Sequence, residues 1–138
     1  MTAARSQIGF TLIELLVVIV IMMSVLGMVG GASINSVKRA EAQSEVIGVY
    51  GLIKKSSVMA FASGASLKLA FLEDRLHIQG HSIDTSYNFQ YLMFEPQQLN
   101  LSRNGWPSKS ELKVKVLDTD RILDLKPIFR VNEWQSDD

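Results

Sequence analysis

The sequence contains no cysteine, which excludes disulfides, thiolate nucleophiles and cysteine-based metal sites. This absence leaves the compartment open, because many exported domains also lack cysteine. Histidine is scarce as well, and His77 and His81 alone provide little material for a metal centre. The sequence also lacks a G-x-S-x-G elbow and a glycine-rich phosphate loop. We therefore expect a protein that is not an enzyme and that uses no cofactor.

The chain also has no net charge at pH 7, because fourteen Lys and Arg residues balance fourteen Asp and Glu residues. Only Arg5 and Glu14 precede residue 35, so the rest of the chain is neutral too. Proteins that bind nucleic-acid phosphates need clustered Lys and Arg, so neutrality argues against such binding as the main role. A local basic patch is still compatible with this balance, and Lys113 and Lys115 are its candidates. A solvated strand face is the favoured interpretation of these two lysines.

Proline and charge are both absent from one long apolar segment, residues 10–34, apart from the single carboxylate of Glu14. An apolar run of 18 or more residues can cross a bilayer as a helix, which takes roughly 20 residues. An ionised Asp at the centre of a membrane helix costs about 2.5–3.5 kcal/mol, and Glu should behave similarly. A residue this costly usually has a partner and a function, and the sequence therefore singles out Glu14.

The order of parts around this segment differs from that of a secretory signal, which places its small-residue cleavage site after the apolar stretch. Here the small residue, Gly9, lies before it. Residues 9–15, Gly-Phe-Thr-Leu-Ile-Glu-Leu, resemble the class III signal of type IV pilins and of the pseudopilins of type II secretion. The resemblance implies that residues 1–9 are a prepilin leader. It also implies that prepilin peptidase cuts between Gly9 and Phe10 and N-methylates Phe10.

The same resemblance gives Glu14 a role. Cleavage would create a positive amine on Phe10, and the carboxylate of Glu14 would neutralise the terminal amine of a neighbouring subunit during assembly. Opposite charges attract strongly in a low dielectric, whereas either charge is expensive when unpaired. The alternative is an interfacial carboxylate that reaches water. The implied partners are prepilin peptidase, other pilin or pseudopilin subunits, an assembly platform protein and inner-membrane lipid.

A glycine cluster interrupts the apolar segment at Gly27, Gly30 and Gly31. Major pilins of the common class often have a proline at the position that Gly31 occupies here. Glycine weakens a helix by roughly 1 kcal/mol relative to Ala. Gly27 and Gly31 also have the G-x-x-x-G spacing that lets two membrane helices approach closely. We expect local loosening or close packing inside a filament rather than a dedicated dimer motif.

The helix is expected to continue beyond the membrane, because residues 35–63 contain no proline. Gly64 is a suitable stop. One continuous helix over residues 10–63 would be about 80 Å long. Its second half is amphipathic, with one apolar face that recurs at helical spacing: Val46, Tyr50, Ile53, Ser57 and Ala60.

The chain after Gly64 has the alternation and turn residues of β-strands. Glu73-Asp74 is predicted to form a tight hairpin turn, and Pro96 is predicted to end a strand. A sheet packed on the amphipathic half-helix would bury both apolar faces. The predicted strands cover residues 66–72, 75–79, 87–94, 98–102, 111–117, 121–125 and 128–131, with a turn at 118–120.

The predicted fold is therefore α+β, with a long N-terminal helix packed on an antiparallel sheet, and the resemblance implies that this fold is type IV pilin-like. The expected parts are a leader at residues 1–9, a transmembrane and filament-core helix at 10–34, and a periplasmic or extracellular globular domain at 35–138. The resemblance implies a single-pass protein of the inner membrane whose C-terminal domain is periplasmic. In this arrangement the protein would be incorporated into a pilus or pseudopilus.

A second resemblance concerns residues 99–105 and the hairpin after them, which are similar to FimT-like minor pilins and H-type minor pseudopilins. In this chain Asp118 to Asp120 replace the glycine that those hairpins often carry. The resemblances imply a minor pilin or pseudopilin that initiates or caps a type IV pilus or a type II secretion pseudopilus, with secreted cargo as a further partner. The alternative is a minor pilin of the same architecture that binds DNA through Lys113 and Lys115 in natural transformation.

Other candidate sites have simpler interpretations. His77 and His81 are interpreted as exposed polar residues rather than metal ligands, because they flank Gly80 at a strand end. The acidic residues near the last hairpin are interpreted as turn residues, because no glycine-centred calcium loop follows them. Contact surface and partly buried packing are equally plausible roles for the two tryptophans. The residues concerned are Asp118, Asp120, Asp124, Trp106 and Trp134.

Overall fold

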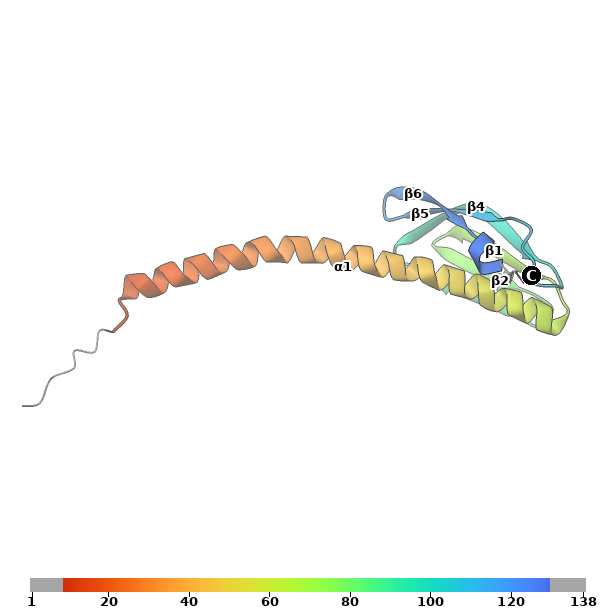
Figure 1. The fold of residues 1–138 in the computed structure, drawn as a ribbon, viewed down its shortest axis with the longest axis horizontal. Helices are drawn as coiled ribbons and strands as arrows, with labels where there is room; N and C mark the ends of the chain where they lie inside the picture. The colour runs from red at the N-terminus through yellow and green to blue at the C-terminus, as the bar shows by residue number, and fades with distance from the viewer. Residues whose placement is uncertain (1–8, 130–138) are drawn as a thin grey trace, which may run out of the picture. The chain divides into compact units, whose positions relative to one another are not determined.

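The computed structural model describes residues 9–129 and, for Ala32, only the backbone. The chain divides into two compact units, and the boundary lies between Arg39 and Ala40. Figure 1 shows the elements in chain order. They are α1 (Leu12–Ser63), β1 (Leu67–Glu73), β2 (Arg75–Gln79), β3 (Asp84–Asn88), β4 (Leu92–Leu101), β5 (Glu111–Val116), β6 (Thr119–Asp124) and α2 (Lys126–Phe129).

The N-terminal unit consists of the first part of α1 and the residues before it. The backbone N–H groups of Glu14 and Leu15 both donate to the Thr11 carbonyl, at 3.1 and 3.2 Å. The helix therefore begins at Leu12, two residues after the predicted start at Phe10. Its apolar part is long enough to cross a membrane, and none of that part is buried within the chain.

The second unit starts with the rest of α1, which carries a buried stripe at spacings of three and four residues. The stripe is formed by Ala42, Val46, Val49, Ile53, Ser56 and Ala60. The predicted face included Tyr50 and Ser57, which are only partly buried because each lies one residue beside the stripe. The helix ends at Ser63, and Gly64 follows it with a φ of +63°, the left-handed conformation typical of a helix stop.

Six antiparallel strands form one sheet in the order β3-β2-β1-β4-β5-β6. The inward side chains of the strands join the α1 stripe in one hydrophobic core, with Leu69, Leu76 and Leu99 fully buried. This arrangement confirms the predicted α+β fold of pilin-like type. The predicted turn between the first two strands is also confirmed, because Leu72 pairs with Arg75 and Glu73 has a φ of +52°.

The prediction of one strand over residues 87–94 is wrong. β3 ends at Asn88, and Phe89–Tyr91 leave the ladder before β4 begins. Hydrogen bonds outside the ladder hold this connection, since the Phe89 N–H donates to the Asp74 carbonyl at 2.8 Å. The carboxylate of Glu45 on α1 accepts from the N–H groups of Gln90 and Tyr91, each at 2.8 Å. Contact with the helix therefore breaks a run that has the composition of a single strand.

Pro96 does not end a strand, and residues 98–102 do not form a separate one. β4 runs through Pro96 to Leu101, with a register shift against β1 between Phe71 and Glu73. The inward residues change from Leu92 and Phe94 before the shift to Leu99 and Leu101 after it. This change of parity indicates a bulge around Pro96, where a missing N–H does not interrupt the ladder to β1.

The last hairpin and the segment after it differ from the prediction in smaller ways. β5 and β6 pair from Glu111–Asp124 to Val116–Thr119, so the turn is Leu117-Asp118 rather than residues 118–120. The predicted strand at 128–131 is wrong in its described part, because Lys126–Phe129 form the short helix α2. The Asp124 carboxylate accepts from the Lys126 N–H at 2.9 Å, and Pro127 fits a first helical turn. Val131 lies outside the described residues.

Candidate assembly site in the N-terminal unit

Glu14 lies in the first turn of α1, where its backbone N–H bonds to Thr11. The order Thr11-x-x-Glu14 is that of a capping box, a sequence pattern typical of helix starts. The free N–H groups at a helix N-terminus also favour a negative charge by about 0.3–1 kcal/mol. Glu14 is therefore locally compatible with the start of this helix even though it lies in an apolar segment.

Within α1 up to Ile34, the polar side chains are those of Glu14, Ser24 and Ser33. The Ser24 hydroxyl donates to the Val20 carbonyl at 2.8 Å, and the Ser33 hydroxyl donates to the Val29 carbonyl at 2.9 Å. Such bonds let a hydroxyl enter lipid, where no water can satisfy it. The Glu14 carboxylate makes no hydrogen bond or ion pair with any described residue. Any protein partner of this carboxylate therefore lies outside the described residues.

Phe10 and Gly9 precede the helix, and both are exposed. Phe10 is 85% exposed, and a Cβ added at Gly9 would meet no atom within 4 Å. The peptide bond between them is therefore accessible. In the uncut chain the Phe10 nitrogen is an amide, so a positive charge at this point arises only after cleavage.

The apolar part of α1 is exposed on every side, from 43% at Val18 to 85% at Met28. A helix that is apolar all round is a membrane span or the core of a larger assembly. A Cβ added at Gly27, Gly30 or Gly31 would meet nothing within 4 Å. The described chain therefore does not require small residues at these positions.

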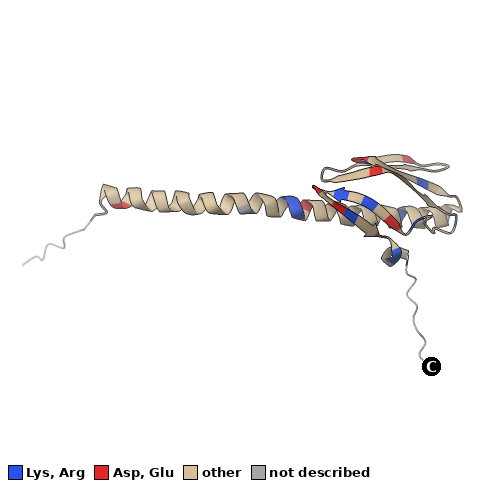
Figure 2. Cartoon of the chain, turned by 90° about the horizontal axis from the view of Figure 1, so that it is seen from above, with Lys and Arg blue, Asp and Glu red and all other residues tan. Residues whose placement is uncertain are grey.

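The predicted basic patch is interrupted by acidic residues. Lys113 and Lys115 lie on the same face of β5, where Lys115 pairs with Asp120 and Lys113 with Ile122 across the hairpin. Glu95 lines the same crevice as both lysines. Figure 2 shows Lys and Arg mixed with Asp and Glu on the strands. A nucleic-acid role for the two lysines stays a prediction.

His77 does not lie at a strand end, because it is central in β2. Its Nδ1 is 2.8 Å from the Ser86 hydroxyl and its Nε2 is 3.0 Å from the Asp84 carboxylate, both on β3. Sequence reasoning missed this set, which depends on the pairing of His77 with Ser86. Asp84 and Ser86 are exposed, so the set ties the edge strand to β2 at the surface. No three metal-ligating side chains gather within residues 9–129.

A second missed cluster joins α1 to the chain before β4. Besides the two bonds to Glu45, the Tyr91 hydroxyl donates to the Glu41 carboxylate. This hydrogen bond, together with burial and the nearby carboxylates of Glu41 and Glu45, raises the pKa of Tyr91. Glu41 and Glu45 lie one helical turn apart, which is the signal that sequence reasoning could have used. The cluster holds the connection between β3 and β4 against α1.

The remaining candidates have structural roles. Asp118 lies in the β5–β6 turn, and Asp124 accepts from the backbone at the start of α2. Trp106 is half exposed, and its ring centroid is 6.2 Å from that of Phe129. Trp134 lies outside the described residues.

Comparisons with known proteins identify the N-terminal segment alone. Residues 4–30 match the family model described as the prokaryotic N-terminal methylation motif. No curated protein and no solved structure matches the chain. The matched motif supports a type IV pilin-like protein, a membrane-anchored structural subunit of pilin or pseudopilin type. It implies processing by prepilin peptidase and assembly with other pilin subunits.

Proposed function

We propose that this protein is a minor pilin or pseudopilin that initiates or caps a type IV pilus or a type II secretion pseudopilus. The observation that carries the proposal is the position of Glu14, at the fifth residue from Phe10 inside the matched motif. Between Leu12 and Ile34 of α1, it is the one polar side chain that has no partner among the described residues. A subunit that gains its partner only by assembling needs such a group.

In this proposal each part of the chain has its own role in assembly. Residues 1–9 are the leader, and cleavage between Gly9 and Phe10 is followed by N-methylation of Phe10. Residues 10–34 hold the subunit in the inner membrane and later form the filament core. Residues 35–138 form the periplasmic domain that contacts other subunits or cargo. Minor status is supported by the absence of a cysteine pair and by glycine at position 31.

Electrostatics explain why assembly and processing are coupled in this proposal. The cleaved and methylated Phe10 carries a positive amine, and the Glu14 carboxylate of a neighbouring subunit carries the opposite charge. Two unit charges 4 Å apart attract by about 4 kcal/mol at an effective dielectric constant of 20. Either charge alone in an apolar environment is unfavourable, so the paired register of two helices is preferred over shifted ones.

A cleavage experiment tests the proposal. The full chain is co-expressed with a prepilin peptidase, and the mass of the product is measured. The wild type is expected to lose residues 1–9 and to gain one methyl group on Phe10, whereas Gly9→Ala is expected to remain largely uncut. A wild-type chain that stays intact beside a correctly processed control prepilin would contradict the proposal.

A further inference from the structure

β4 pairs with the stretch 107–116, which includes β5, at both ends of that stretch, and the pairing is open in the middle. At one end Leu92 pairs with Val116, and Met93 pairs with Lys115. At the other end Leu101 bridges to Pro107, in the same register. Between these ends residues 94–99 face residues 109–114, and no ladder pair joins these two described stretches. The bulge around Pro96 explains the opening, because it reverses which groups of β4 point toward β5.

The side chain of Gln97 fills part of the gap. Its Nε2 donates to the Lys113 carbonyl, and its Oε1 accepts from the Lys113 N–H at 3.2 Å. A carboxamide has the same donor and acceptor as a peptide group. Gln97 therefore makes with Lys113 the two bonds that a residue of an inserted strand would make.

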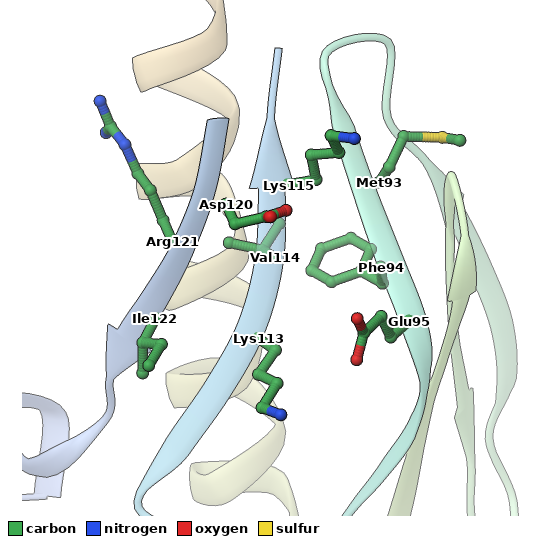
Figure 3. Close-up of a pocket in the computed structure, with 9 residues that line it drawn as sticks. All are labelled: Met93, Phe94, Glu95, Lys113, Val114, Lys115, Asp120, Arg121 and Ile122. Atoms are coloured by element: carbon green, nitrogen blue, oxygen red, sulfur yellow. The ribbon is translucent and has the colours of Figure 1, made fainter. Parts of the chain in front are cut away.

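A crevice of about 630 Å³ lies at this gap and is lined by β4, β5 and β6. Figure 3 shows Phe94 and Val114 facing one another between β4 and β5, with Arg121 directed away. Phe94 and Val114 are buried and form an apolar floor. A second crevice of about 590 Å³ continues along the same strands past Gln97 and shares Lys113 with the first.

The charges around the first crevice are nearly balanced, with Lys113, Lys115 and Arg121 against Glu95 and Asp120. A polyanion such as nucleic acid requires an excess of cations. A neutral main chain, which presents both donors and acceptors, fits a lining that carries both signs. The charge pattern therefore favours a peptide as the ligand.

We propose that this crevice binds an extended peptide segment of another protein, whose main chain pairs with β5 at Lys113 and displaces the Gln97 carboxamide. Strand addition of this kind obtains its affinity from main-chain hydrogen bonds. The long extended segments within residues 9–129 are already strands of the sheet. The described part of a second copy therefore has no free extended segment that could bind in the crevice. The proposal depends only on the second unit, so its failure would leave the assembly role of Glu14 untouched.

Binding is tested with the full chain in detergent micelles and a fluorescent peptide that copies residues 119–124, the strand that already pairs with β5. Gln97→Ala removes the internal competitor and is expected to bind the peptide about tenfold more tightly than the wild type, since two hydrogen bonds no longer compete. Gln98→Ala, next to it on the exposed side of β4, is the matched control and is expected to bind like the wild type. A peptide with alternate N-methylated amides is expected not to bind.

Gln97→Glu provides a second variant that keeps the shape of the side chain. It can accept from the Lys113 N–H but cannot donate to the Lys113 carbonyl when ionised, so an intermediate affinity is expected. Equal affinities in all variants, or equal binding of the N-methylated peptide, would overturn the proposal. Self-association of Gln97→Ala in sedimentation without any peptide would also overturn it, because the occupant would then be a second copy.

Discussion

The two parts of α1 have the same backbone geometry and opposite burial. Val18 and Ile19 in the first part are 43% and 45% exposed, whereas Val49 and Ile53 in the second part are fully buried. The buried residues of the second part belong to the same unit as the sheet and pack with it in one hydrophobic core. Apolar character by itself therefore does not place a residue in a core, and the first part is left for lipid or for other subunits.

The serines of α1 show the same contrast. Ser24 and Ser33 bond back to their own helix, whereas the Ser57 hydroxyl donates to the Gly105 carbonyl at 2.7 Å, in the loop before β5. Gly105 has a φ of +78°, and an added Cβ would lie 2.8 Å from the Ser57 carbonyl oxygen. Helix and loop thus meet closely in the second unit, whereas the hydroxyls of Ser24 and Ser33 bond within their own helix.

The largest expected effect is on the free energy of unfolding, and it is tested by one matched substitution in each part of α1. Ile53→Ala removes fully buried methyl groups and is expected to lower the free energy of unfolding by about 2–5 kcal/mol. Ile19→Ala, in the exposed part, is expected to change it by less than about 0.5 kcal/mol. Urea unfolding in micelles, followed by near-UV circular dichroism, measures both. Equal losses would show that the first part also packs within the monomer.

A second pair compares two glutamates. Glu45→Ala leaves the N–H groups of Gln90 and Tyr91 without their carboxylate and is expected to lower the unfolding free energy by about 1–2 kcal/mol. Glu14→Ala is expected to leave the stability of the second unit unchanged and to impair assembly. The same unfolding assay, with filament formation by electron microscopy, separates these roles. Normal filaments from Glu14→Ala would refute the intersubunit pairing.

Glycine substitutions are expected to act in opposite directions in the free and assembled states. Gly31→Ala should stabilise the helix of the free chain by about 1 kcal/mol, because no described atom lies near the added methyl group. If neighbouring helices approach closely at this position, the same methyl group should reduce assembly. Gly48→Ala in the second part is the control, since its added Cβ also meets nothing. Far-UV circular dichroism and filament yield give the two readouts.

The smallest effect is expected at the lysines of β5. Substituting Lys113 and Lys115 together by Gln should change DNA affinity by less than about twofold at physiological salt, because Asp120 and Glu95 already offset them. A band-shift assay measures the change. A large loss of binding would support the natural-transformation alternative.

Much of the fold could be predicted from periodicity. The end of α1 at Ser63, the strand Arg75–Gln79 and the turn at Glu73-Asp74 follow from local residue patterns. Two of the errors, the single strand over residues 87–94 and the strand end at Pro96, occurred where distant groups intervene. Glu45 holds the chain between β3 and β4, and pairing with β1 carries β4 through Pro96. A local pattern, such as the one-turn spacing of Glu41 and Glu45, does not show which distant groups the residues contact.

The sequence by itself determined the apolar segment, its single carboxylate and the motif around Gly9, because these depend only on residue identity and order. It also determined the general α+β architecture through its hydrophobic periodicity. Only the tertiary structure decided the split between β4 and β5, the carboxamide that bridges it, and the joining of His77 to Asp84 and Ser86. Those features arise from strand register, which aligns residues that are separate in the chain.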